Sequence, residues 1–175
     1  MTRSILTHAF AHHAWANERI FEACGSLGSA ELMAPVPGAY GPIIAILHHL
    51  VDADAFYLRV LTGRDDFVSI DENSRFSVEE LATFSKQHEA AYAAYLDSAT
   101  DPDADVVEHG EGFEFHAPLG IRLGQVLHHG TDHRSQICTA LTGLELTPPL
   151  IDLWDYAEAR GMSTSVDLRE DQPTT

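Results

Sequence analysis

The sequence predicts an all-α protein: a four-helix bundle with a short β-hairpin between the third and fourth helices and a short C-terminal helix. Apolar residues recur every three to four positions in four long segments. A stretch containing Gly or Pro follows each of these segments. Of the 175 residues, 45% are hydrophobic, which is enough for one domain with a core. Four amphipathic helices around one core are typical of a bundle.

The first two helices are expected at residues 3–24 and 43–61. In both segments one face carries most of the large apolar side chains. The sequence GSLGS ends the first segment, and Gly63 ends the second, because Gly readily adopts the left-handed conformation that closes a helix.

The third helix is expected to begin at Ser77 and to continue to about Ser98. Ser77 and Glu80 have the spacing of a capping box, in which each side chain satisfies a free N–H group at the start of the helix. Residues 100–116 then change character, because the short segments VVEH and FEFHA flank the sequence GEG at 110–112. This pattern predicts a β-hairpin.

The fourth helix is expected at residues 119–141, with Gly143 as its stop signal. The segment LIDLWDYAEARG, at 150–161, predicts a short amphipathic helix. We expect one domain over residues 1–162 and a frayed tail over 163–175.

Composition excludes several classes of protein. The net charge of −17 argues against binding to nucleic acid or to anionic membranes, which requires clustered Lys and Arg. No uninterrupted apolar run is long enough to span a membrane, and the N-terminal segment lacks the features of a signal peptide. Only two cysteines are present, Cys24 and Cys138, and we expect both to be small buried hydrophobic residues in a reducing, cytoplasmic protein.

Histidines in two of the predicted helices suggest a metal site. His129 and His133 are four residues apart, so their side chains lie on one helix face and can reach a single ion. This spacing alone is a moderate signal, because the first predicted helix contains another pair of histidines with the same spacing, His8 and His12. A catalytic metal usually has three protein ligands and an open position. His48 or His49 could supply the third, and spacing alone does not decide between them or exclude a hydrogen-bonded core histidine.

Three segments together resemble the DinB/YfiT family of metal-binding four-helix bundles. They are HAWANERI at 13–20, HLVDADAFY at 49–57 and HGTDHRSQI at 129–137. The third is similar to the family's His-x-x-x-His-Arg-Gly-Gln-Ile signature and is the most specific of the three. Their order and spacing agree with the family along almost the whole chain.

The resemblance implies that one histidine of the second helix and two of the fourth bind a divalent ion such as zinc, nickel or iron. Transferred residue by residue, these ligands are His49, His129 and His133. His48 and His128 lie one position away, about 100° around the helix, and should not reach the ion.

The sequence departs from the family pattern at two positions. Ser135 stands where the family usually has Gly, and His128 stands where Asn is frequent. Neither change removes a ligand, but both concern the groups that orient the ligands. Asp132, one turn after His128, could pair with it.

Arg134 could hold a substrate anion, although we favour an ion pair with Glu18 or Asp54. The other histidines are expected at the surface or in satisfied contacts, with a role in proton transfer as an alternative for the first three: His8, His12, His13, His88, His109 and His116. The aromatic residues expected in the core or in a pocket wall are Trp15, Phe56, Tyr57, Phe84, Tyr92 and Trp154.

For function, the resemblance implies a metal-dependent transferase or isomerase that joins a low-molecular-weight thiol, such as mycothiol or bacillithiol, to an electrophile. The alternatives are a non-catalytic module that binds metal or a small ligand in a stress response, and a metal-dependent hydrolase. The sequence identifies no catalytic side chain beyond the ligands. Bundles of this family are often dimers, so we expect a homodimer.

Overall fold

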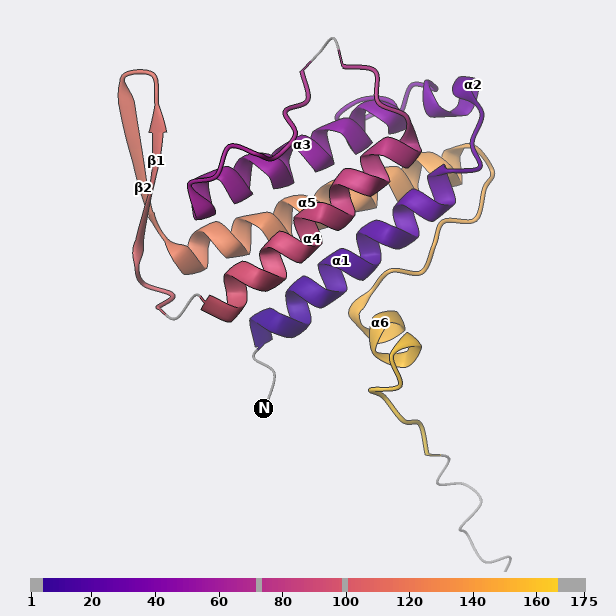
Figure 1. Ribbon diagram of the computed structural model, residues 1–175. Coiled ribbons are helices and arrows are strands. Elements are labelled where there is room, and N and C mark those ends of the chain that lie inside the picture. Colours follow the sequence, from indigo (N-terminus) through magenta and orange to yellow (C-terminus); the bar gives the residue numbers. More distant parts are fainter. Residues whose placement is uncertain (1–4, 72–73, 99–100, 167–175) are drawn as a thin grey trace, which may run out of the picture.

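The computed structural model describes residues 5–71, 74–98 and 101–166, and its body is a bundle of four long helices (Figure 1). These helices are α1 (Ile5–Cys24), α3 (Ile43–Thr62), α4 (Val78–Ser98) and α5 (Leu119–Gly143). Both α1 and α3 pack against α4 and α5. The predicted four-helix bundle is confirmed.

The ends of the helices follow from local chemistry. Gly63 has a φ of 68° and its N–H donates to the Arg59 carbonyl, which closes α3. At the start of α4, the Ser77 N–H donates to Glu80 Oε2 at 2.8 Å, and the Glu80 N–H donates to Ser77 Oγ at 3.2 Å. The predicted capping box is therefore present.

The hairpin consists of β1 (Asp105–Gly110) and β2 (Phe113–Pro118), which pair in antiparallel orientation and extend from one end of the bundle (Figure 1). The second strand extends one residue beyond the predicted segment FEFHA, and α5 begins directly after Pro118. Arg122 of α5 anchors the hairpin, since its guanidinium donates to Glu108 Oε2 and to the Phe115 carbonyl, each at 2.7 Å.

Two short helices complete the described structure. The single turn α2 (Ser29–Leu32) lies in a connection for which the sequence predicted no helix. The predicted short helix is α6 (Leu153–Ala159), which contacts α1 (Figure 1). It buries Tyr156, whereas Trp154 is 78% exposed and Phe56 of α3 is also exposed, so of the two expected positions, core or pocket wall, the core is excluded for both. Tyr92 is buried as expected.

The core has two apolar clusters separated by a band of buried polar residues. One cluster surrounds Ile20, Leu47 and Ile137, and the other surrounds Phe10, Leu58 and Leu123. We call the band between them the polar belt; its members are His13, Asn17, Asp54, Ser85, His88, His133 and Arg134. All four long helices contribute to this belt, which places polar chemistry at the middle of the bundle.

The described residues contain no helix that is long and apolar enough to cross a membrane. Of the predicted frayed tail, residues 163–166 are exposed and outside any helix, and residues 167–175 lie outside the described residues. The boundary of the domain at residue 162 stays a prediction.

Candidate metal centre

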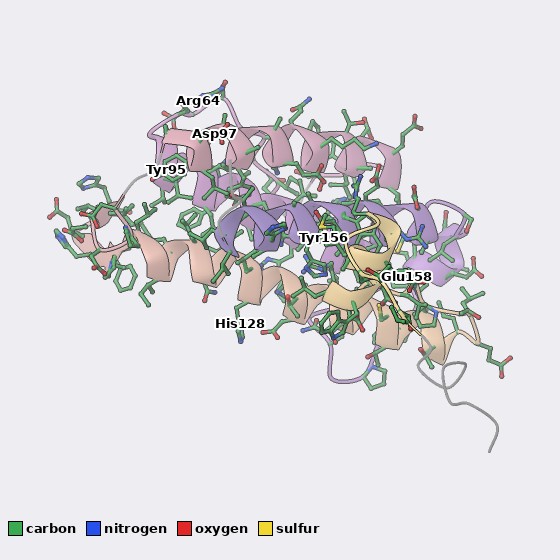
Figure 2. The ribbon with its side chains drawn as sticks, turned by 90° about the horizontal axis from the view of Figure 1, so that it is seen from below. Arg64, Tyr95, Asp97, His128, Tyr156 and Glu158 are labelled. Atoms are coloured by element: carbon green, nitrogen blue, oxygen red, sulfur yellow. The ribbon has the colours of Figure 1, made fainter. Side chains whose placement is uncertain are left out.

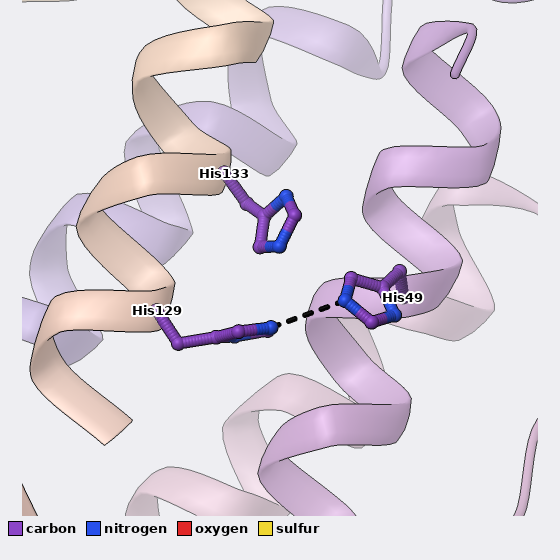
Figure 3. Close-up of side chains that lie close together, drawn as sticks. All are labelled: His49, His129 and His133. Carbon is purple, nitrogen blue, oxygen red and sulfur yellow. Dashed lines mark hydrogen bonds between the residues drawn. The ribbon is translucent and has the colours of Figure 1, made fainter. Parts of the chain in front are cut away.

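The three histidines named from the family signature come together between α3 and α5 (Figure 3). His129 and His133 project from successive turns of α5, and His49 faces them from α3. One ring nitrogen of each lies within 4.8 Å of those of the other two. Nε2 of His49 and Nε2 of His129 are 3.1 Å apart.

The donor set fits a divalent transition-metal ion. Two imidazole nitrogens that bind one tetrahedral zinc ion at the usual bond length lie about 3.3 Å apart, close to the separation of the two Nε2 atoms. Imidazole suits zinc, nickel and iron. Nδ1 of His129 and Nδ1 of His133 are buried and have no hydrogen-bond partner among the described residues. These rings are thus not fixed in direction by a hydrogen-bonded carboxylate.

All three histidines favour the neutral form that binds metals. Burial, together with the nearby His133 and His49, lowers the pKa of His129 to about 4. Burial also lowers the pKa of His49, with a further contribution from His133. For His133, burial lowers the pKa and a hydrogen bond with Gln136 opposes it. Protons therefore compete weakly for these nitrogens at neutral pH.

Aromatic side chains also contact the three imidazole rings. Tyr40, in the connection between α2 and α3, stacks on His49 with ring centroids 4.1 Å apart and an angle of 14° between the planes. The same ring meets the edge of His133. The Tyr40 N–H donates to Gln136 Oε1 at 2.9 Å, which ties the connection to α5. Tyr57 contacts His129 edge-on, which agrees with its expected place in the core or in a pocket wall.

His48 and His128 lie outside the cluster. The ring of His48 turns toward the segment before α4, where its Nε2 bonds the Phe76 carbonyl at 3.0 Å. His128 is exposed and points away from the bundle (Figure 2), and its Nδ1 lies 3.3 Å from Asp132 Oδ2. The structure thus separates histidines that are adjacent in the sequence.

Comparison with known proteins identifies the family. The family model of the DinB family matches residues 1–171. The chain belongs to the DinB family. Among solved structures, a DinB-like protein from Bacillus cereus ATCC 10987 has a TM-score of 0.68, with 16% identity over 87% of this chain and 100% of that chain. At this level of identity, the likeness shows only that the two proteins share a fold. The search of curated proteins gave no match.

Arg134 of this DinB protein does not form the expected ion pair. Its guanidinium donates to His13 Nδ1 and Asn17 Oδ1, and it reaches Asp54 only through the His13 ring. Glu18 instead pairs with the exposed Lys86, whose Nζ lies 3.5 Å from Glu18 Oε1. The expectation was wrong because α1 places the imidazole of His13 between Arg134 and Asp54.

The remaining histidines differ in their surroundings. His109 and His116 are at the surface beside carboxylates of the hairpin, as expected. His12 bonds the Ile151 carbonyl at 2.8 Å. For His88, the expectation of a surface position or a satisfied contact was wrong. The residue is buried in the bundle, and its Nδ1 has no hydrogen-bond partner among the described residues. Burial lowers its pKa, so it is neutral at neutral pH.

A groove of about 620 Å³ lies beside His49 in the DinB protein. Residues that line it include Tyr40, Ile44, His49, Asp52, Ile70 and Phe76. Its size suits a small organic molecule. No sequence signal pointed to Tyr40, because it lies in a Gly- and Pro-containing connection that the structure alone brings over the histidines.

Proposed function

We propose that this DinB-family protein binds one divalent metal ion, such as zinc, nickel or iron, through His49, His129 and His133. The observation that carries the proposal is the convergence of the three imidazoles, with two Nε2 atoms 3.1 Å apart. Three neutral nitrogens leave an open coordination position, as in catalytic sites of this kind. Binding of cobalt in a one-to-one ratio to the untagged protein is expected.

We further propose that the protein is a transferase or isomerase that uses a low-molecular-weight thiol. An ion held by three neutral imidazoles keeps its positive charge and would lower the pKa of a bound thiol. The chain itself supplies the groove beside His49, with Tyr40 and Phe76 as aromatic walls for the rest of a substrate. These features support binding of a small molecule next to the ion.

The cobalt-substituted protein tests for an open position. Addition of mycothiol, bacillithiol or glutathione is expected to change its visible spectrum, and metal-replete protein is expected to conjugate one of them to chlorodinitrobenzene or monochlorobimane. A spectrum that no thiol changes, with no turnover, would contradict the thiol-dependent activity and favour a non-catalytic module. Metal-dependent ester cleavage without thiol turnover would favour a hydrolase.

The assembly that we propose is a homodimer. Phe113 and Phe115 of β2 and Ile121 of α5 expose more than half of their surface, which supports an apolar contact at the hairpin end. Sedimentation of the metal-loaded protein as a monomer at high micromolar concentration would contradict this proposal.

A further inference from the structure

A chain of contacts crosses the polar belt from α5 through α1 to α3. Arg134 Nη1 lies 3.1 Å from His13 Nδ1, and His13 Nε2 lies 3.4 Å from Asp54 Oδ2. The exposed fractions of Arg134, His13 and Asp54 are 2%, 2% and 3%. Because Arg only donates, His13 Nδ1 accepts from Arg134, while His13 Nε2 lies between Asp54 Oδ2 and the amide nitrogen of Asn17, which is 3.2 Å away. The His13 ring therefore lies between the guanidinium of Arg134 and the carboxyl group of Asp54.

Further hydrogen bonds reach Arg134 and Asp54, the two residues at the ends of this series of contacts. Asn17 Oδ1 accepts from Arg134 Nη1 at 2.8 Å, and Thr131 Oγ1 accepts from Nη2 at 3.2 Å. At the other end, the Tyr92 hydroxyl donates to the Asp54 carbonyl at 3.2 Å. The Arg134 guanidinium is thus held by several acceptors, whereas the bond from Tyr92 goes to the backbone of Asp54, and Asp54 Oδ1 is buried with no hydrogen-bond partner among the described residues.

This chain lies on the same two helices as the metal ligands. Arg134 directly follows His133, about 100° around α5, and Asp54 is five positions after His49, about 140° around α3, so neither shares the helix face of the ligand beside it. Two sets of contacts therefore connect α3 and α5. One is the histidine cluster, and the other is the series of contacts that runs through His13 of α1. Because Nδ1 of His129 and of His133 has no partner among the described residues, the directions of these rings depend on the placement of α5.

We infer that Arg134, His13 and Asp54 are positioning residues that hold α5 in the register against α3 in which His129 and His133 meet His49. This inference rests on the proposed metal site. Asn17, whose amide oxygen accepts from Arg134, is buried at the same junction.

Gly130 shows how closely the helices approach at this junction. A Cβ atom at Gly130 would overlap His13 Cε1 and would lie 2.8 Å from both His13 Nδ1 and Arg134 Nη1. Gly124, on the same helix, has nothing within 4 Å of the corresponding position. A side chain is therefore excluded at Gly130 by the contact between His13 and Arg134.

The first test compares Gly130→Ala with the matched control Gly124→Ala. Both changes improve helix propensity, so both should favour α5 by this measure. Titration with cobalt should give wild-type affinity for Gly124→Ala, and affinity weaker by on the order of tenfold, with a shifted visible spectrum, for Gly130→Ala. Wild-type affinity and spectrum in Gly130→Ala would overturn the inference.

The second test separates positioning from stability. His13→Leu removes both contacts, whereas the amide of His13→Gln can accept from Arg134 and donate to Asp54. We expect weakened cobalt binding in His13→Leu and recovery in His13→Gln. Ile20→Ala, a buried change on the same helix, should lower stability and leave the cobalt spectrum unchanged.

The outcomes of the second test are distinguishable. Equal loss of cobalt affinity in His13→Leu and Ile20→Ala, or no recovery in His13→Gln, would overturn the positioning role. Failure of the wild-type protein to bind cobalt would instead contradict the proposed function, and the inference would fall with it.

Discussion

Tyr40 shows how one exposed side chain can shape a partly buried site. It is 59% exposed, so its contribution to the hydrophobic core is small, yet its ring stacks on His49. Aromatic pairs of this geometry contribute about 1 kcal/mol beyond the area they bury. Tyr40→Ala is therefore expected to weaken cobalt binding about fivefold, by that energy, with little change in the free energy of unfolding.

Tyr40→Phe is the control, because it keeps the ring and removes only the hydroxyl. Isothermal titration with cobalt should give near wild-type affinity for Tyr40→Phe. Equal affinities of Tyr40→Ala and wild type would show that stacking does not orient His49.

At the scale of single residues, some members of the candidate site could be predicted from the sequence and others could not. The four-residue spacing placed His129 and His133 on one face by geometry alone. The choice between His48 and His49 needed the family pattern, because both belong to the same apolar segment and helical periodicity does not define which of two neighbours faces α5. Arg134 was misjudged because its partner His13 is 121 positions away, and local patterns contain no information on such contacts.

At the scale of elements, the capping box of α4 gives a direct test of local chemistry. Ser77→Ala removes the hydroxyl that accepts from the Glu80 N–H, so we expect a loss of about 1 kcal/mol in the free energy of unfolding. Thr83→Ala is the control, since it removes an exposed hydroxyl in the interior of the same helix, where Ala is the better helix former.

Chemical denaturation measures both variants. The capping role would be contradicted by a Ser77→Ala variant as stable as Thr83→Ala. Cobalt affinity should stay unchanged in both, because neither residue contacts the polar belt.

Elements with strong boundary signals were predictable, and short ones were not. Gly63 and the pair Ser77 and Glu80 defined helix ends that the structure reproduces. The single turn α2 escaped prediction because four residues carry no periodicity. In α6, seven residues could not indicate that Tyr156 faces α1 and Trp154 faces solvent.

At the scale of the whole molecule, one partly buried carboxyl group makes stability depend on pH. Burial, with the nearby Glu18 as a smaller cause, raises the pKa of Glu89 to about 7 from its ordinary value of 4.5. The fold thus favours the protonated form. Its stabilising contribution is present below the ordinary pKa and is lost as the pH rises through about 7.

Glu89→Gln keeps the neutral form at every pH. Relative to wild type, its free energy of unfolding is expected to increase between about pH 5 and about pH 8. Glu22→Gln, which changes a more exposed carboxylate of the same groove between α1 and α4, should show no such increase. Denaturation curves at both pH values check this, and a Glu89→Gln advantage independent of pH would contradict the shifted pKa.

The central claim is that His49, His129 and His133 bind one metal ion, whereas the adjacent His48 does not take part. The most direct measurement is the cobalt stoichiometry of His49→Ala and His48→Ala, prepared without a tag and compared with wild type. We predict that His49→Ala loses the bound ion and that His48→Ala retains one ion per chain. Retention of cobalt by His49→Ala together with its loss from His48→Ala would contradict the account.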